Sequence, residues 1–357
     1  MLSRERFLIA LKGGIADRVP IFEFPFSQRI QRILLGYSTE LYEGKEAVKI
    51  ANKLGIDAVP VFLGGYCGVE FFKTDGMDCV DDWGVRYKRK GYPIISQIES
   101  PIKGRKDWQQ YSMPDPKASW RFKQLADAAD ANQKDKAIIA CIRGPVSVLS
   151  WFLLNIESLS YNIADDPSLV MGICDSFVEW SLRLAETAAG TEKIDAFLIA
   201  DDWGMTNSLL ISPKILRKFF LKPFKRLVQG IRRLGYPVIM HNDGNIWEML
   251  EELVNTGIDA YHPVEKAASM DLGRIKQKYK GRLCPIGNID NKKILVTGTP
   301  EDVKKETLRC LEEGSKDGGY IISSDHSLHD DIPIENVWAY INTAKKYGMY
   351  KKDKLIL

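Results

Sequence analysis

The chain repeats one pattern of polarity eight times: a short apolar run, then polar or small residues, then a longer amphipathic segment. Short apolar runs with such endings are typical of buried parallel strands, and the longer segments have helical spacing. The predicted strands are Arg18–Phe22, Asp57–Phe62, Ala137–Cys141, Ala196–Ala200, Pro237–Met240, Gly257–Tyr261, Leu283–Ile286 and Gly319–Ser323.

Eight strand–helix units without a break in composition predict a (β/α)8 TIM barrel, with residues 1–357 as a single domain. A helix over 2–12 forms an N-terminal extension. Alternating residues about Lys90-Gly91 predict a β-hairpin inserted after the second strand. A doubly wound open sheet is the alternative. The first strand lacks a G-x-G-x-x-G turn, and polar groups follow nearly every strand rather than one switch point, so the barrel is favoured.

Composition and charge indicate which partners and which cellular location are expected for the protein. The net charge of +3 is small and evenly spread, which argues against a nucleic-acid partner or an anionic membrane surface. The amino terminus has no apolar signal core, and no apolar run reaches membrane-spanning length. Six cysteines are widely spaced without a C-x-x-C, which predicts reduced thiols in a chain of this length. These features predict a cytoplasmic protein.

All four histidines lie at, or just past, the end of a predicted strand, where a barrel carries its functional groups. His241 and Asp243 are two residues apart, so their side chains face the same way. With His326 from the last strand they supply two imidazoles and a carboxylate, enough for a divalent metal with one open position, and zinc suits the nitrogen ligands. The alternative is that the histidines are satisfied hydrogen-bonding residues and that Asp243 caps the helix beginning at Ile246.

Two adjacent carboxylates, Asp201 and Asp202, follow the fourth predicted strand. Such a pair can hold a cation, or divide into an acid and a base because like charges push their pKa values apart. One member could instead order the loop that follows. On their placement at a strand end, we predict that Asp201, Asp202 and His241 are catalytic.

Further polar residues at the strand ends are candidates for contact with a substrate. They are Glu23, Arg143, Trp203, His262 and Asn288. Arg143 could bind a carboxylate or phosphate, or could pair with Asp201 or Glu23. Asn288 could line the mouth or cap the next segment. The aromatic side chains that could line a pocket or pack in the core are Phe24, Tyr66, Trp83 and Trp203.

A series of short motifs, taken in chain order, resembles the uroporphyrinogen decarboxylase superfamily over almost the whole chain. The motifs are Arg18-Val-Pro, Asp81-Asp-Trp-Gly84, Asp201-Asp-Trp-Gly204, Leu210-Ile-Ser-Pro213, His241-Asn-Asp-Gly244, Gly298-Thr-Pro300, Gly318-Gly-Tyr-Ile321 and Ile332-Pro-Ile-Glu-Asn336. The resemblance implies a (β/α)8 barrel, in agreement with the strand pattern.

The resemblance allows two functions. True decarboxylases carry an arginine-rich R-Q-A-G-R-Y segment after the first strand, which binds the acidic substrate. The matching stretch, Glu23-Phe-Pro-Phe-Ser-Gln-Arg29, lacks it. The other branch holds methyltransferases that act on coenzyme M, or on methylated substrates with a corrinoid protein. The coenzyme M enzymes hold zinc by H-x-C and a later cysteine, where this chain has His241, Asp243 and, at about the later position, His326. The missing thiolates favour the corrinoid-linked branch.

The resemblance therefore implies a methyltransferase that moves a methyl group between a small donor, such as an aryl methyl ether or a methylamine, and a corrinoid protein. Metal would polarise the donor oxygen or nitrogen while reduced corrinoid cobalt attacks the methyl carbon. Asp201 or Asp202 would orient or protonate the leaving group. No D-x-H-x-x-G corrinoid signature occurs, so cobalamin is expected on a partner protein. A tetrapyrrole decarboxylase and a non-catalytic small-molecule-binding barrel are the alternatives, and the sequence leaves room for a homodimer.

Overall fold

The computed structural model describes residues 1–39, 42–64, 73–75, 78–89, 95–133, 135–351 and 354–355. Its centre is a seven-stranded parallel sheet whose strands are arranged in the same order as they occur in the chain. In order, the strands are β1 (Ala58–Phe62), β6 (Ala137–Arg143), β7 (Ala196–Ala200), β10 (Val238–His241), β11 (Ala260–His262), β12 (Cys284–Ile289) and β13 (Ile321–Ser324). All their residues except Arg143 are buried, as expected of strands covered on both faces.

The segment predicted as the first strand joins the two edges of this sheet. Ile21 bridges Ile322 of β13, and Phe22 bridges Ala58 of β1, both in the parallel sense. The sheet therefore curls round until its edge strands meet on either side of one segment. This is the architecture of a TIM-like barrel.

The same segment does not form the regular strand that was predicted over 18–22. Pro20 has no amide hydrogen to donate to a neighbouring strand. The Ile21 N–H donates to the Asp57 carboxylate at 2.8 Å instead of to a strand carbonyl. The segment consequently contributes isolated bridges rather than a continuous ladder.

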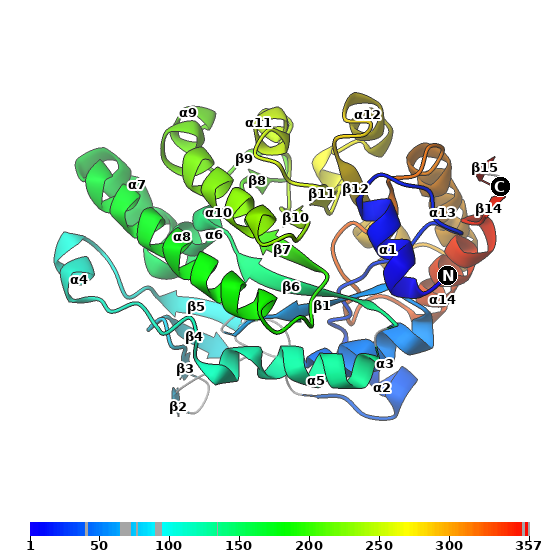
Figure 1. Ribbon diagram of the computed structural model, residues 1–357, viewed down its shortest axis with the longest axis horizontal. Coiled ribbons are helices and arrows are strands. Elements are labelled where there is room, and N and C mark those ends of the chain that lie inside the picture. The colour runs from blue at the N-terminus through cyan, green and yellow to red at the C-terminus, as the bar shows by residue number, and fades with distance from the viewer. Residues whose placement is uncertain are drawn as a thin grey trace.

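Helices surround the curled sheet (Figure 1). Close neighbours among them are α3 with α5, α8 with α10, and α13 with α14. Within the described ranges, no helix combines the length and apolarity needed to cross a bilayer. The helices are α1 (Ser3–Leu11), α2 (Gln28–Leu35), α3 (Gly44–Leu54), α4 (Arg105–Gln110), α5 (Lys123–Asn132), α6 (Pro145–Ser147), α7 (Asn155–Asp165), α8 (Pro167–Ala189), α9 (Pro213–Ile215), α10 (Leu221–Arg233), α11 (Leu250–Val254), α12 (Leu272–Lys278), α13 (Pro300–Gly314) and α14 (Ile334–Tyr347).

The N-terminal helix α1 lies against the amino ends of the strands. The Arg4 N–H donates to the Asp135 carbonyl at 2.7 Å, just before β6, and the Arg4 guanidinium donates to Asp195, just before β7, at 2.6 Å. The carboxyl ends of the strands, where the predicted site residues lie, are therefore at the end of the sheet that α1 does not cover.

A separate antiparallel sheet of four strands follows β1, in the order β2-β3-β4-β5. The sequence predicted a single hairpin in this region. β4 and β5 pair antiparallel where that hairpin was expected, and β2 and β3 extend the sheet by two strands. The predicted turn at Lys90-Gly91 lies outside the described residues. The strands are β2 (Lys73–Asp75), β3 (Asp78–Val80), β4 (Arg86–Arg89) and β5 (Ile95–Glu99).

A buried carboxylate, Asp57, fastens the closing segment at its amino end. Asp57 is fully buried and accepts hydrogen bonds from Arg6 at 2.7 Å and from Arg18 at 2.8 and 2.9 Å. It also accepts the Ile21 N–H. Helix α1 and the closing segment are thus tied to the start of the strand β1 through one side chain, which pairs with Arg18 and shares Arg6 with Asp17.

A second buried carboxylate, Glu23, fastens the other end of the segment. Its two oxygens accept the Ser324 N–H at 2.6 Å and the Ser324 hydroxyl at 2.7 Å, which ties the segment to the end of β13. Burial raises the pKa of Glu23 to about 7, against the opposing effect of these hydrogen bonds.

We expect Asp57→Asn to lower the free energy of unfolding by about 3–5 kcal/mol, because it leaves the largely buried Arg18 guanidinium without a negative partner and removes one of the two carboxylates that pair with Arg6. Urea denaturation measures the effect. Asp17→Asn is the matched control: Asp17 also pairs with Arg6, but its side chain is 36% exposed, so we expect a loss of less than about 1 kcal/mol. Equal losses in the two variants would contradict this account of closure.

We expect Glu23→Gln to remove a pH dependence of stability. The pKa of Glu23 is higher in the folded chain than in the unfolded chain. Its contribution is therefore fully present below about pH 4.5 and is lost as pH rises through about 7. Between these limits the wild type should lose about 3 kcal/mol relative to Glu23→Gln, measured by urea denaturation at several pH values. Parallel pH profiles for the two proteins would refute the assignment.

Candidate active site at the strand ends

Three neighbouring strands end at the same level, and this alignment builds the site. Ala200 of β7 pairs with His241 of β10, which pairs with His262 of β11. Residues opposite one another in a parallel pair face the same side of the sheet, and so do residues two positions apart along a strand. The side chains of His241 and His262 therefore share one face, and Asp202 and Asp243 follow β7 and β10, each two residues beyond the aligned level.

The two histidines are in direct contact. Their Nδ1 atoms are 2.8 Å apart, and their ring centroids are 5.0 Å apart with an interplanar angle of 26°. The Phe24 ring packs against both, at centroid distances of 5.6 and 5.3 Å. Burial lowers the pKa of His241 to about 4 and that of His262 well below its usual value. Both rings are consequently neutral at physiological pH.

The other nitrogen of His241 faces carboxylates. His241 Nε2 lies 3.7 Å from Asp243 Oδ1, and the Asp243 N–H donates to Asp202 Oδ1 at 3.1 Å. Asp202, His241 and Asp243 each present one donor atom, all within 4.8 Å of one another. Asp243 Oδ1 is buried and has no hydrogen-bond partner among the described residues. A buried oxygen left without a partner is a costly feature that a bound cation would satisfy, so the three residues fit a divalent metal.

His326, which the sequence predicts as the third ligand, lies beside this group without belonging to it. Its Nε2 is 3.4 Å from Asp243 Oδ2, and its Nδ1 is 2.7 Å from the Ser327 hydroxyl. Burial would lower the pKa of His326, but the neighbouring Asp243 and Asp325 carboxylates raise it to about 9. The side chain is half exposed, so His326 stands at the open rim. The structure groups Asp202, rather than His326, with His241 and Asp243.

Asp201 and Asp202 are adjacent in sequence but occupy different environments. Asp201 is fully buried, and its oxygens accept the Ser147 N–H and the Trp203 indole N–H, each at 2.7 Å. The Asp201 side chain can occupy this position only because residue 144 is glycine: a Cβ atom there would lie 2.2 Å from the Asp201 carboxyl carbon. For Asp202, burial and the Asp243 carboxylate raise the pKa to about 7. Asp201 orders the loop after β7, and Asp202 reaches the cluster.

The remaining predicted substrate contacts already have polar partners. Glu23 is bonded to Ser324, the indole of Trp203 to Asp201, and His262 to His241. The Asn288 amide donates to the Val264 carbonyl at 2.9 Å and its oxygen accepts from Arg309 at 2.8 Å. Their contact with a substrate stays a prediction.

Arg143 lies toward the antiparallel sheet. Its guanidinium carbon is 3.4 Å from the centre of the Phe152 ring. Burial raises the pKa of the Tyr87 hydroxyl in β4, and the nearby Arg143 charge opposes that rise. Of the aromatic residues predicted to line a pocket, Phe24 contacts the histidines. Trp83 packs against Trp180 with a distance of 4.5 Å between the ring centroids. Tyr66 lies outside the described residues.

Two residues of the site carried no signal in the sequence. Ser147, in the short helix α6, accepts the Asp202 N–H through its hydroxyl at 2.7 Å. Glu265 accepts the Gly244 N–H at 2.6 Å and adds a further carboxylate near Asp202. Ser147 and its partner Asp202 lie in different strand–helix connections, and so do Glu265 and its partner Gly244. Local spacing in the sequence therefore could not identify them.

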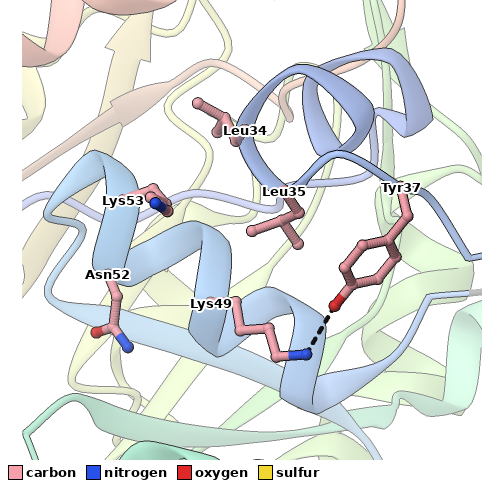
Figure 2. A pocket seen from close by; sticks show the side chains of 6 residues that line it. All are labelled: Leu34, Leu35, Tyr37, Lys49, Asn52 and Lys53. Carbon is pink, nitrogen blue, oxygen red and sulfur yellow. Dashed lines mark hydrogen bonds between the residues drawn. The ribbon is translucent and has the colours of Figure 1, made fainter.

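A separate surface hollow of about 440 Å³ lies between α2 and α3 (Figure 2). It shares no residue with the cluster. Lys49 is bonded to the Tyr37 hydroxyl at 2.6 Å, and Leu34 and Leu35 form the apolar part of the lining. Exposed lysines with local partners do not by themselves define a binding site.

The curled sheet and the cluster define a TIM-like barrel protein with ionisable groups gathered at the carboxyl ends of its strands. The family model of uroporphyrinogen decarboxylase matches residues 82–347. The chain therefore belongs to the uroporphyrinogen decarboxylase family.

Relatives within this family carry different names. The uroporphyrinogen decarboxylase of Psychromonas ingrahamii is 22% identical over 267 residues, 71% of this chain and 72% of that protein. The methylated-thiol–coenzyme M methyltransferase of Methanosarcina mazei is 23% identical over 216 residues, 60% of this chain and 55% of that protein. A solved methyltransferase from Methanosarcina mazei superposes with a TM-score of 0.75 at 19% identity, covering 97% of this chain and 99% of its own. The last likeness supports the fold.

We expect the purified protein to bind one zinc ion, and His241→Ala and Asp202→Asn each to weaken binding by more than about 100-fold, because each removes one of three donors. Competition with a chromophoric chelator measures the affinity. His329→Ala, a histidine of the same loop as His326, is the control and should bind zinc as the wild type does. His326→Ala should reduce the zinc affinity less than Asp202→Asn does. A larger loss in His326→Ala would instead support the ligand set predicted from the sequence, which is His241, Asp243 and His326.

Proposed function

We propose that the chain is a metal-assisted methyltransferase that moves a methyl group between a small methylated donor and a corrinoid protein. The observation that carries the proposal is the donor group of Asp202, His241 and Asp243, with its buried, unpartnered carboxylate oxygen at the ends of β7 and β10. Zinc is the proposed ion. When bound, it would polarise the donor oxygen or nitrogen and so improve it as a leaving group.

The chemistry of the donors favours an oxygen or nitrogen leaving group over a thiol. In the part of the chain that the structure describes, no cysteine sulfur belongs to the group. One imidazole and two carboxylates form a harder ligand set than thiolates, and harder sets suit harder leaving atoms. We therefore propose aryl methyl ethers or methylamines as donors, although one relative is named for a methylated thiol.

The chain's own residues would place the donor at the rim of the cluster. His326 is half exposed and lies 3.4 Å from Asp243 Oδ2, with its ring centroid 6.3 Å from that of His241, where it can contact the donor's leaving group. The Phe24 ring packs against both buried histidines and so contributes to their apolar surroundings. The corrinoid is proposed to arrive as the methyl acceptor on a partner protein, and the chain is proposed to be cytoplasmic.

Decarboxylation of a tetrapyrrole is the second candidate, because the family model and several relatives bear that name. The local charges oppose it. Asp202 and Asp243 belong to the cluster and Glu265 lies beside it, and a substrate with many carboxylates would be repelled by these three side chains. The stretch after the closing segment, Glu23-Phe-Pro-Phe-Ser-Gln-Arg29, also lacks the R-Q-A-G-R-Y segment expected to bind such a substrate.

We expect zinc-loaded protein to transfer methyl groups from an O-methyl or N-methyl compound to cob(I)alamin, followed by the visible absorption of methylcobalamin. Anisole derivatives and mono-, di- and trimethylamine form the test panel, with methanethiol as the soft comparison. His241→Ala should lower the rate by at least about 100-fold, because it removes a proposed ligand, whereas His329→Ala should leave it unchanged. Conversion of uroporphyrinogen at a rate on the order of one per second, without methyl transfer, would overturn the proposal in favour of decarboxylation.

A further inference from the structure

We propose that His262 is a positioning residue that fixes the tautomer of His241, so that the lone pair of His241 Nε2 faces the donor group. The proposal rests on the metal site proposed above for its consequence, but the tautomer itself can be tested without metal. It gives His262 a role other than the substrate contact predicted from the sequence.

The contact between the two rings allows two arrangements. Their Nδ1 atoms are 2.8 Å apart, so one proton lies between them. In the first arrangement His241 Nδ1 donates to His262 Nδ1, and His241 Nε2 carries a lone pair. In the second, His262 Nδ1 donates, and His241 Nε2 carries the proton.

The surroundings of His241 Nε2 decide between them. In the second arrangement its N–H needs an acceptor, but Asp243 Oδ1 is 3.7 Å away, beyond hydrogen-bond distance. The Nε2–H would then have no hydrogen-bond partner among the described residues, and the buried Asp243 oxygen would lack one as well. In the first arrangement the lone pair and the Asp243 oxygen are both ligand atoms that a cation satisfies together. The Ser323 hydroxyl, 3.4 Å from His262 Nε2, can rotate to suit either case.

His262 is held firmly enough to impose this choice. It is fully buried at the end of β11, in register with His241. Its ring packs against Phe22, at a centroid distance of 5.4 Å and nearly perpendicular, and against Phe24, at 5.3 Å. A side chain enclosed in this way has little freedom to turn, so its Nδ1 remains directed at His241.

A partner of this kind raises the affinity of a histidine ligand for metal. A metal-binding imidazole normally donates its other N–H to a fixed acceptor, and loss of that acceptor typically costs 10–100-fold in affinity. We therefore expect His262→Phe, which keeps a ring but has no acceptor, to weaken zinc binding by about 10–100-fold. His262→Gln, whose side-chain oxygen can accept the proton, should recover most of that loss.

The experiment combines chelator competition with nitrogen-15 NMR of the imidazoles. In metal-free wild type we expect His241 to carry its proton on Nδ1, and in His262→Phe this preference should be lost. His329→Phe, the same substitution outside the cluster, should change neither reading. Circular dichroism checks that each variant is folded. The nitrogen-15 NMR spectrum of the wild type decides the tautomer even if His262→Phe does not fold.

Two results would overturn the proposal: a proton on His241 Nε2 in the metal-free wild type, or unchanged zinc affinity in folded His262→Phe. Failure of the wild type to bind zinc is a different outcome. It would refute the metal site of the proposed function, whereas the nitrogen-15 spectrum would still decide whether His262 sets the tautomer of His241.

Discussion

The parallel register of β7, β10 and β11 is the constraint on which the site depends. It sets Ala200, His241 and His262 at one level, so the two imidazoles meet directly. A shift of one residue would turn one histidine to the opposite face of the sheet and separate the pair. Asp202 and Asp243 follow from the same alignment, because each lies two residues beyond the aligned level.

Within this frame, burial and hydrogen bonding divide residues of similar chemistry into different roles. Asp201 is engaged by a backbone N–H and an indole, whereas its neighbour Asp202 reaches the cluster. His262 is enclosed by phenylalanines, His241 faces the carboxylates, and His326 stands half exposed beside Asp243. The site is thus a neutral imidazole and two carboxylates, a set that favours a cation over an anionic ligand.

The barrel reaches this arrangement only because its first segment is held between the edge strands. Asp57 and Glu23 fasten that segment at opposite ends, one by charge pairing and one by hydrogen bonds to β13. Phe24 follows directly and supplies the ring that packs on His241 and His262. Closure of the sheet and covering of the site are therefore performed by consecutive residues.

The sequence by itself determined the alternation of strands and helices, because apolar runs with polar ends depend only on local order. It also marked His241 and Asp243, since two positions on one strand share a face. It could not determine that residues 18–22 form bridges rather than a strand, because the diversion of the Ile21 N–H to Asp57 is a contact between segments 36 residues apart.

Tertiary structure alone decided the partners of His241. That His262 and Asp202 converge there, and that Ser147 binds the Asp202 N–H, follows from which strands are neighbours and in what register, and local spacing carries no information about either. His326 follows β13, which is not adjacent to β10, and it contacts Asp243 without joining the group of three donors.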